Sequence, residues 1–554
     1  AGELYFNGQN TGLVNTANGG AIDGLGLATF LLGDTSSFGR YVSSSTNAQE
    51  HQPRFFWYGQ DEWRVTPKLT ATLGVRWEMV FPESVNAAGN GATLDLQNGL
   101  MYVFGEGGVS MHGIQTMNWH EFAPRVGLAY QVDKKTVVRA GYGWSYNLGT
   151  FGSTFGHNVT QNPPVLANQQ INVPASQPFA SVFSLADGPT TLAPISVASN
   201  GTFPLPNGIS PKFRPDTMTM PVIYQYNGTI QRQLSNKIAI SGGYVGNSTR
   251  HGWLGTSNTV NPNEAIWNST TETAARPYAA LYGWGQDLGY YCNCSNQQYN
   301  SFQSTLTIKA LSGWTVQGNY TYQQLMSWDG PYDTNYYFLR GPQNGAGGYG
   351  ESSLLPHDQI TLAQNYDIPF GHGQKFGSTA NKGVDLALGG WTVSAITTFY
   401  SGLPFAPSID NYGSAAGVVK PSAGPNNRPD MGSGTPYSTT QNRNQWIVGC
   451  PDQVCTSGPY AYPASNTFGN YPIDTLIGPH FINFDFSAMK QFHITERVSF
   501  GLRMDSRNFF NHTNLGGPNN DVTAPNVGQI TGIAFGGNNG VGMRTLQFSG
   551  NIKF

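Results

Sequence analysis

The sequence predicts an all-β protein whose strands form an antiparallel transmembrane β-barrel, with about fourteen strands in this chain. Three observations lead to this prediction: a low content of charged residues, long stretches that alternate apolar and polar residues, and connections that alternate between short and long. Together they indicate a sheet with one face toward hydrocarbon and the other toward a polar lumen.

Charged residues make up 11% of the 554 residues, with 28 Lys and Arg against 31 Asp and Glu. Soluble domains carry about 25%, so an ordinary soluble surface is disfavoured. The net charge of −3 gives no reason to expect nucleic acid or anionic lipid as a partner. The longest apolar stretch, around Leu27–Leu32, is much shorter than the ~20 residues of a membrane helix. The start, Ala1-Gly2-Glu3-Leu4, lacks the features of a signal peptide, so either a signal was removed or the chain is a fragment.

The segment from Leu69 to Phe81 alternates between apolar odd positions and polar even positions, which is the period of a β-strand. Its predicted partner, Arg54–Val65, precedes it across the tight turn Thr66-Pro67-Lys68. A lead strand near Glu3–Gly8 and a final strand at Val541–Phe554 complete the count of about fourteen. The same pairing recurs at 123–132 with 136–148, 221–234 with 238–248, 299–310 with 314–325, 358–369 with 390–401, and 479–490 with 497–510.

The connections are short on one side of the strand pairs, except for the longer link around Gly371, and long on the other. Short periplasmic turns and long extracellular loops are typical of an outer-membrane barrel. A β-sandwich is the alternative, but it would have strands of ~5–6 residues and would not place every long loop at one end. We therefore expect a lead strand and first extracellular loop in 1–52, a barrel wall in 53–554, and no plug domain. The predicted long loops are 82–121, 149–220, 249–298, 327–356, 402–478 and 511–540.

Seven charged residues of the strands fall on the non-apolar face, as expected if that face lines the lumen. A charge on the lipid face would cost about 2–4 kcal/mol at the bilayer midplane. The side chains expected to face inward are Arg76, Glu78, Arg125, Arg139, Arg503, Asp505 and Arg507. Those expected to face lipid are Leu73, Val75, Trp77, Val138, Tyr142, Phe484, Phe486, Phe500, Leu502, Leu546 and Phe548.

The four cysteines form two close pairs, Cys292 with Cys294 and Cys450 with Cys455. Their spacing does not fit a zinc ribbon, so we expect disulfides in an oxidising compartment and no metal. Three connectivities are open. Cys450 and Cys455 can close a small ring, whereas a bond across the single residue between Cys292 and Cys294 would be strained.

Catalytic and cofactor-binding motifs are not found, so we expect neither an enzyme nor a cofactor. The aromatic stretch Tyr278–Tyr291 leaves two interpretations open. Its rings could stack on sugars or peptides, or they could belong to an aromatic girdle or to the packing of a loop.

Several stretches resemble the TonB-dependent outer-membrane receptors, in particular their Oar-like branch. They include Tyr58–Glu78, Phe122–Tyr130, Thr136–Gly143, Tyr299–Gln303, and Gly389–Val393 with Ser401–Pro404, and they follow the family's order. The resemblance implies a barrel of twenty-two strands preceded by a plug with a TonB-contacting box. This chain is similar to the C-terminal part of that barrel alone. The plug and about eight strands would then be supplied by the missing N-terminal part or by another chain.

The last strand alternates Leu546, Phe548, Ile552 and Phe554 on one face and ends on an aromatic residue. Such an end is typical of outer-membrane proteins, and the resemblance implies that the barrel-assembly machinery recognises it. The expected surroundings are outer-membrane lipid, with the long loops outside the cell.

Two functions follow as alternatives. The first is a TonB-dependent receptor barrel that binds and takes up, or exports, a large substrate, with the TonB system as a partner by resemblance only. The second is a plugless or two-chain barrel with a structural, adhesive or surface-assembly role.

Overall fold

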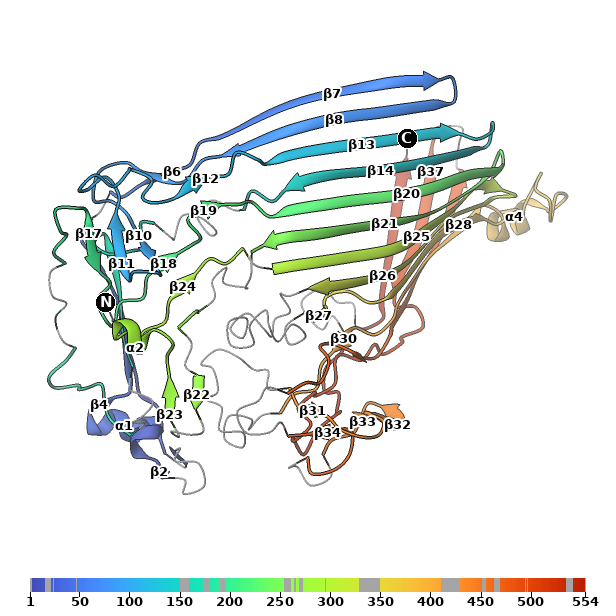
Figure 1. The fold of residues 1–554 in the computed structure, drawn as a ribbon. Coiled ribbons are helices and arrows are strands. Elements are labelled where there is room, and N and C mark those ends of the chain that lie inside the picture. Colours follow the sequence, from blue (N-terminus) through green and yellow to red (C-terminus); the bar gives the residue numbers. More distant parts are fainter. Residues whose placement is uncertain are drawn as a thin grey trace.

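In the computed structural model, thirteen long strands form one continuous antiparallel sheet (Figure 1). The two-residue strand β27 (Gly350–Glu351) pairs with β26 and makes the sheet fourteen-stranded. The structure describes residues 2–14, 21–22, 24–45, 47–149, 159–172, 179–189, 191, 195–253, 261–263, 266–268, 273–293, 295–327, 349–409, 428–450, 455–462, 469–493, 495, 497–534 and 542–553. The long strands are β7 (Arg54–Thr66), β8 (Leu69–Val80), β13 (Phe122–Gln131), β14 (Thr136–Tyr146), β20 (Val222–Ser235), β21 (Ile238–Gly252), β25 (Ser295–Leu311), β26 (Trp314–Ser327), β28 (Asp358–Asp367), β29 (Trp391–Tyr400), β36 (Phe481–His493), β37 (Ser499–Arg507) and β38 (Thr545–Lys553).

These thirteen strands confirm the predicted strand pairs to within a few residues at most ends. Each strand pairs with its neighbour in sequence, as a meander of hairpins does. Long apolar–polar alternation fixes the register, because a slip of one residue would reverse the face of every side chain.

The prediction that the lead strand belongs to the large sheet is wrong. β1 (Gly2–Tyr5) forms where it was expected, but it pairs with β5 (Ser37–Ser43), which in turn pairs with β15 (Leu166–Asn172). The strand count of about fourteen therefore agrees only because β27 joins the sheet. The structure does confirm that Glu3–Gly8 and Val541–Phe554 are not joined, since in the described chain β38 pairs with β37 and β1 pairs with β5.

The sheet is strongly curved, so that β7 to β26 lie in front in Figure 1 and β28 to β38 turn away behind them. Its two edges are β7 and β38, and neither has a second neighbour among the described strands. The described strands therefore form a curved wall with two edges.

Long connections leave one end of this wall, and short turns close the other (Figure 1). The turn between β25 and β26 consists of Ser312 and Gly313, with φ of 51° and 85°. Two positive φ angles suit the right-handed twist of a hairpin, and glycine adopts them at little cost. At the turn after β7, the Thr66 hydroxyl accepts a hydrogen bond from the Leu69 amide at 3.0 Å.

The long connections are folded, which the sequence did not predict. Ala92, Met101, Phe203, Trp284 and their neighbours form a buried core contributed by the connections after β8, β14 and β21. We call this the first loop unit. Its strands and those nearby are β10 (Ala92–Asp95), β11 (Leu100–Val103), β17 (Thr202–Pro204), β18 (Lys212–Phe213), β24 (Gly289–Tyr290), β6 (Glu50–His51), β9 (Ser84–Val85), β12 (Thr116–Met117), β19 (Thr217–Met218), β22 (Ile266–Asn268), β23 (Thr273–Ala275), β2 (Leu13–Val14), β3 (Ala21–Ile22), β4 (Asp34–Thr35) and β16 (Phe183–Ser184).

A second loop unit has its own core, which includes Ile409, Ile447, Tyr460 and Val522 from the connections after β29 and β37. Figure 1 places it at the same end of the sheet as the first unit. Its strands are β30 (Pro404–Phe405), β31 (Asp430–Met431), β32 (Tyr437–Asn442), β33 (Gln445–Ile447), β34 (Tyr460–Ala461) and β35 (Leu476–Ile477).

Helices are short and few in the described residues. They are α1 (Gly26–Leu32), which contains the apolar stretch around Leu27–Leu32, α2 (Ala279–Tyr282), α4 (Lys382–Leu388) and the 3₁₀ turn η1 (Gln9–Thr11). None of the described helices combines the length and the apolarity needed to cross a membrane.

Candidate functional site: the polar face and the loop units

The ladder register places all seven predicted inward-facing charged residues on one face of the sheet. Arg125 lies opposite Gly74 and Gly143, and Arg139 lies opposite Ala129 and Thr229. Residues that face each other in a ladder lie on the same side of the sheet. Following the pairs from strand to strand therefore places Arg503, Asp505 and Arg507 on the same face as Arg125. We call this the polar face.

Polar and aromatic neighbours surround these charges. Arg76 forms an ion pair with Glu78 at 3.2 Å and lies 4.6 Å from the centre of the Phe56 ring. Arg503 forms an ion pair with Asp505 at 2.8 Å. The Arg139 guanidinium donates to the Gln231 side-chain oxygen at 3.1 Å. The polar face therefore carries paired charges and amides, as a water-filled lumen requires.

Glycines make room for one of these arginines. A Cβ added to Gly74 would lie 2.9 Å from Arg125 Cγ, and one added to Gly143 would lie 3.3 Å from Arg125 Cβ. The side chain of Arg125 thus lies over two strands that have no side chain at that level. This close packing explains why glycine interrupts the alternating pattern on both neighbouring strands.

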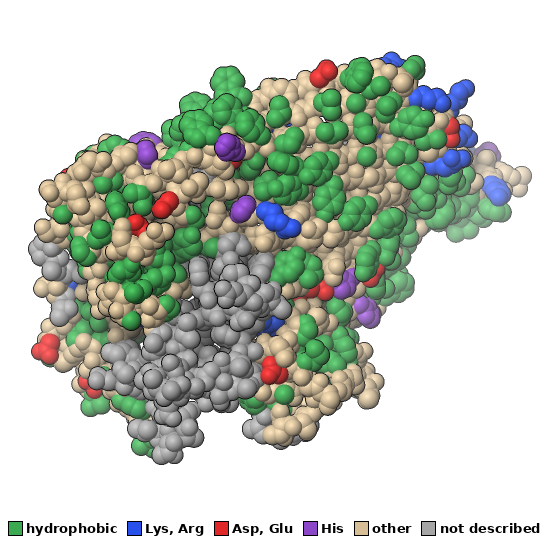
Figure 2. Space-filling model, viewed as in Figure 1, with side chains coloured by type: hydrophobic (Ala, Val, Ile, Leu, Met, Phe, Trp, Pro, Cys, Tyr) green, Lys and Arg blue, Asp and Glu red, His purple; other side chains and the backbone are tan. Residues whose placement is uncertain are grey.

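The opposite face is apolar, and it carries every residue predicted to face lipid. Leu73 lies opposite Val126, which lies opposite Tyr142, and Met504 lies opposite Phe548. Leu73, Val75 and Tyr142 are each 46–47% exposed, in keeping with a face that meets hydrocarbon. Figure 2 shows hydrophobic side chains spread over the near face of the strands. Rings border this face at the loop end, where Trp77 stacks on Phe122 and Trp144 meets Tyr224 edge-on.

A hollow of about 390 Å³ opens where the first strand enters the loop units, lined by Glu50, His51, Gln52, Pro53 and Arg54. Directly beside it, the Gln52 amide donates to Glu83 at 3.2 Å. Polar atoms are therefore concentrated at the junction between the polar face and the first loop unit.

Glu83 forms a buried ion pair with Arg214, and both side chains are almost completely shielded from solvent. The Arg214 guanidinium also donates to the Gln115 side-chain oxygen at 2.8 Å. The three residues come from two different long connections, so this cluster fastens those connections together. Buried charges are stable only when they are paired and hydrogen-bonded in this way.

Glu50 lies at the edge of the same cluster. Its carboxylate accepts a hydrogen bond from the Thr160 amide at 2.9 Å. Burial raises its pKa to about 7, because desolvation disfavours the charged form more than the Thr160 amide stabilises it. The nearby Glu83 adds to the rise, and Arg214 opposes it. This carboxyl group therefore changes charge near neutral pH.

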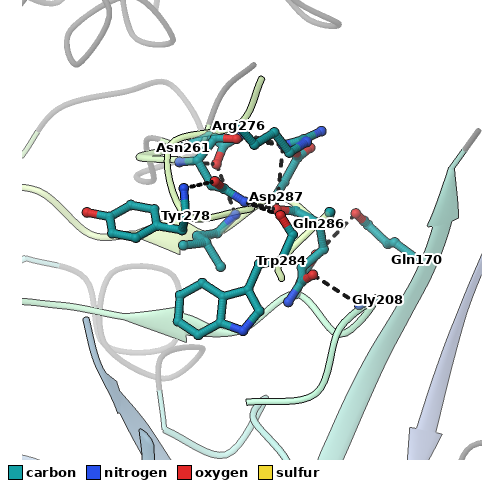
Figure 3. Close-up of polar contacts among 12 residues, drawn as sticks. Gln170, Gly208, Asn261, Arg276, Tyr278, Trp284, Gln286 and Asp287 are labelled. Carbon is teal, nitrogen blue, oxygen red and sulfur yellow. Dashed lines mark hydrogen bonds and ion pairs between the residues drawn. The ribbon is translucent and has the colours of Figure 1, made fainter. Parts of the chain in front are cut away.

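A hydrogen-bonded network joins the second and third long connections (Figure 3). The Arg276 guanidinium donates to Asp287 at 2.7 Å and to the Asn263 backbone oxygen at 2.7 Å. The Gln286 side-chain oxygen accepts from the Gly208 amide at 3.0 Å. The Trp284 indole donates to the Leu205 backbone oxygen at 3.1 Å. The first loop unit is thereby cross-linked through both polar and apolar contacts.

The aromatic stretch Tyr278–Tyr291 belongs to this packing. Trp284 is 1% exposed, and its ring lies 4.5 Å from that of Tyr282 and 6.0 Å from that of Tyr278. Of the two predicted interpretations, loop packing therefore describes these three side chains. Contact with a ligand is not tested by the structure.

A second carboxyl group with a raised pKa lies near the second loop unit. Asp474 is fully buried, and desolvation raises its pKa to about 7, with Arg428 opposing the rise. Arg428 donates to the Tyr471 backbone oxygen at 2.7 Å. Desolvation also raises the pKa of Glu121, in the connection after β8, to about 7. Both halves of the loop region thus contain carboxyl groups that titrate near neutrality.

The cysteines follow the prediction as far as the structure describes them. Cys450 and Cys455 form a disulfide. Cys292 is also disulfide-bonded, and Cys294 lies outside the described residues. Among the residues that the structure describes, no group of three His, Cys, Asp or Glu side chains could hold a metal ion.

The predicted assembly signal lies at an edge of the sheet. Leu546, Phe548 and Ile552 share the apolar face of β38 and are 52%, 69% and 57% exposed, whereas Phe554 lies outside the described residues. Recognition of this end by the barrel-assembly machinery stays a prediction.

A comparison of the chain with protein-family models identifies the family to which this architecture belongs. A family model described as "Outer membrane beta barrel domain" matches residues 1–547. The chain belongs to this family. Its location is therefore the outer membrane, and the apolar face is the surface that meets lipid. No curated protein matches the chain.

Several solved structures are similar in fold at low identity. The ferripyoverdine receptor of Pseudomonas aeruginosa is 12% identical with a TM-score of 0.40, over 92% of this chain and 39% of that one. The outer membrane transporter YddB from Escherichia coli is 8% identical with a TM-score of 0.40, over 93% and 55%. The ferric-catecholate import receptor Fiu from Escherichia coli is 10% identical with a TM-score of 0.36, over 93% and 50%. The chain thus spans about two fifths to just over half the length of these proteins.

The buried cluster of Glu50, Glu83, Gln115 and Arg214 was missed at the level of sequence. Its members lie in connections without periodicity, where nothing indicates which side chains become buried. One signal was present: Glu83 and Arg214 are charged residues in loops that carry few charges.

Proposed function

We propose that this chain is the barrel wall of a TonB-dependent receptor of the Oar-like branch, which binds and moves a large substrate across the outer membrane. The observation that carries the proposal is the combination of a polar face, which carries charged side chains and amides, with folded loop units at one end of the wall. A transport barrel needs both features, because the lumen must be wet and the substrate must be captured before it enters.

The two sheet edges support a partner that completes the wall. An open edge in hydrocarbon leaves a row of unsatisfied N–H and C=O groups, each costly without water. On this proposal β7 and β38 pair with strands outside the chain, from an N-terminal part of the same protein or from another chain. The plug and the TonB-contacting segment belong to that same missing part.

The test uses the full-length protein, purified from outer membranes in detergent, and the purified periplasmic domain of TonB. Saturable binding to the full-length protein is expected, and no binding to the 554-residue chain produced alone and confirmed to be folded. A full-length protein that does not bind TonB would contradict the receptor proposal.

A surface-assembly role is the second candidate, and one observation favours it. Leu27, Leu31 and Leu32 of α1 are 69%, 75% and 67% exposed at the far end of the loop region. Large exposed apolar patches often mark contacts with other proteins. This function would survive deletion of TonB, whereas energy-coupled transport would not.

A further inference from the structure

One connection at the turn end differs from all the others there. Between β28 and β29 the chain runs for more than twenty residues and contains α4, whereas its neighbours are turns of a few residues. The segment has a defined fold. The Asn381 side chain caps α4 by accepting from the Val384 amide at 2.9 Å, and Asp385 accepts from the His372 amide at 2.6 Å.

Glycines at both ends of the segment allow this fold. A Cβ added to Gly371 or to Gly389 would lie 2.5 Å from the Asp385 carboxylate oxygen. Gly371 also has a φ of 129°, which side chains rarely adopt. Asp385 therefore draws the two ends of the segment together around its carboxylate.

The surface that this segment presents is apolar. Val384, Leu386 and Leu388 of α4 are 38%, 62% and 53% exposed, and Phe376 is 55% exposed. A seven-residue helix in water gains nothing from such side chains. Their exposure calls for a partner that removes them from water.

The C-terminal end of α4 is tied to the apolar face of the sheet. The Trp391 indole donates to the Ala387 backbone oxygen at 3.0 Å, and the Lys490 ammonium donates to the Gly389 backbone oxygen. Trp391 and Lys490 lie opposite each other in the ladder of β29 and β36. By the register they share the face of Leu73, which is the face that meets lipid.

Trp391 and Lys490 lie at the height on the sheet where the membrane boundary is expected. Trp391 begins β29, and Trp314 begins β26 at the same end of the sheet. The Lys490 ammonium lies 5.4 Å from the centre of the Trp391 ring. Tryptophan and lysine at strand ends are typical of the interface between hydrocarbon and headgroups.

We propose that α4 and Phe376 insert into the headgroup–acyl boundary of the outer membrane at the turn end of the barrel. The occupant of this apolar surface is lipid, because the surface continues the lipid-facing side of the sheet. Apolar side chains drive the insertion, so a zwitterionic bilayer is sufficient. The segment thereby lies in the membrane interface, attached to one hairpin, and does not span the bilayer.

The experiment places an environment-sensitive fluorophore on Leu386→Cys in the full-length protein, reconstituted in vesicles of phosphatidylcholine. The disulfide-bonded cysteines do not compete for the label. Leu128→Cys, on the apolar face of β13, is the lipid control. Gln374→Cys, exposed in the turn before Phe376, is the aqueous control.

We expect brominated phosphatidylcholine to quench the Leu386 label at least half as strongly as the Leu128 label. Aqueous iodide should quench it several-fold less than the Gln374 label. Iodide quenching equal to that of Gln374 would overturn the proposal, and so would a label reached by neither quencher, since protein would then cover the helix.

Adding Leu388→Asp should reduce lipid quenching of the Leu386 label several-fold while the barrel stays heat-modifiable on gels. Unchanged quenching would also refute the proposal.

Discussion

The guanidinium of Arg214 and the carboxylate of Glu83 form an ion pair across two long connections, and neither side chain reaches solvent. The residues are 131 positions apart in the sequence. Their contact therefore reports on the folding of the connections as a unit, rather than on the stability of any one strand pair.

Arg214→Met should destabilise the first loop unit by about 3–5 kcal/mol, because Glu83 would remain buried without its partner. Hydrogen exchange of the amides in β9 and β10 measures this loss. Replacing both residues, as Arg214→Met with Glu83→Leu, should cost much less than the single change. Arg232→Met, which breaks an exposed pair with Asp133, is the control and should leave the exchange unchanged. A single variant no worse than this control would contradict the prediction.

The first loop unit should lose stability as the pH rises. Glu50 has a pKa raised from its usual 4.5 to about 7, so folding favours its protonated form. The stabilisation is complete below pH 4.5 and is lost as the pH passes through 7. Protection of β6 and β9 against hydrogen exchange, corrected for intrinsic rates, should be greater at pH 5 than at pH 8.

Glu50→Gln should flatten this pH dependence in β6 and β9. It should not change the pH dependence around Asp474, which has its own raised pKa in the other half of the loop region. Glu106→Gln, at an exposed turn, is the matched control. If the profile of the Glu50 variant keeps its full slope, another group is responsible.

The two faces of β8 should respond differently to the same charge. Val75→Arg, in the middle of the strand on the apolar face and opposite Gly59 and Pro124, should destabilise the barrel in vesicles by about 2–4 kcal/mol. Thr72→Arg, on the polar face of the same strand and opposite Glu62, should cost far less. Urea unfolding of the full-length protein in phosphatidylcholine vesicles gives both values. Equal losses would mean that the faces are assigned wrongly.

Removal of the disulfide between Cys450 and Cys455 by substitution should loosen the second loop unit alone. Closing a ring of this size stabilises a fold by about 2 kcal/mol in the chain-entropy model. Both cysteines lie in the core with Ile409, Tyr460 and Val522, so Cys450→Ser with Cys455→Ser should accelerate proteolysis there. The first loop unit serves as the internal control, because its core contains none of these residues. Equal acceleration in both units would show that they unfold together.

The strands could be predicted from the sequence because each repeats a local pattern over ten or more residues. Leu69–Val80 alternates from end to end, and the tight turn before it contains Pro67 and Lys68. The alternation then restricts the register, since a slip of one residue would separate Leu73, Val126 and Tyr142 onto different faces.

The loop units could not be predicted in the same way. Met101, Phe203 and Trp284 meet in one core, although they come from three connections with no shared period. Contacts of this kind depend on how the strands bring the connections together, and a single sequence carries no record of that. The lead strand failed for a related reason: a short extended segment pairs with whichever edge is nearest, and for β1 that edge belongs to β5.

The first loop unit also constrains how the protein can be built. Its core takes segments from the connections after β8, β14 and β21. The complete core can therefore close only after all three connections have been made. The connection after β21 is the last of these in the sequence, so its arrival makes three distant parts of the wall fold as one unit.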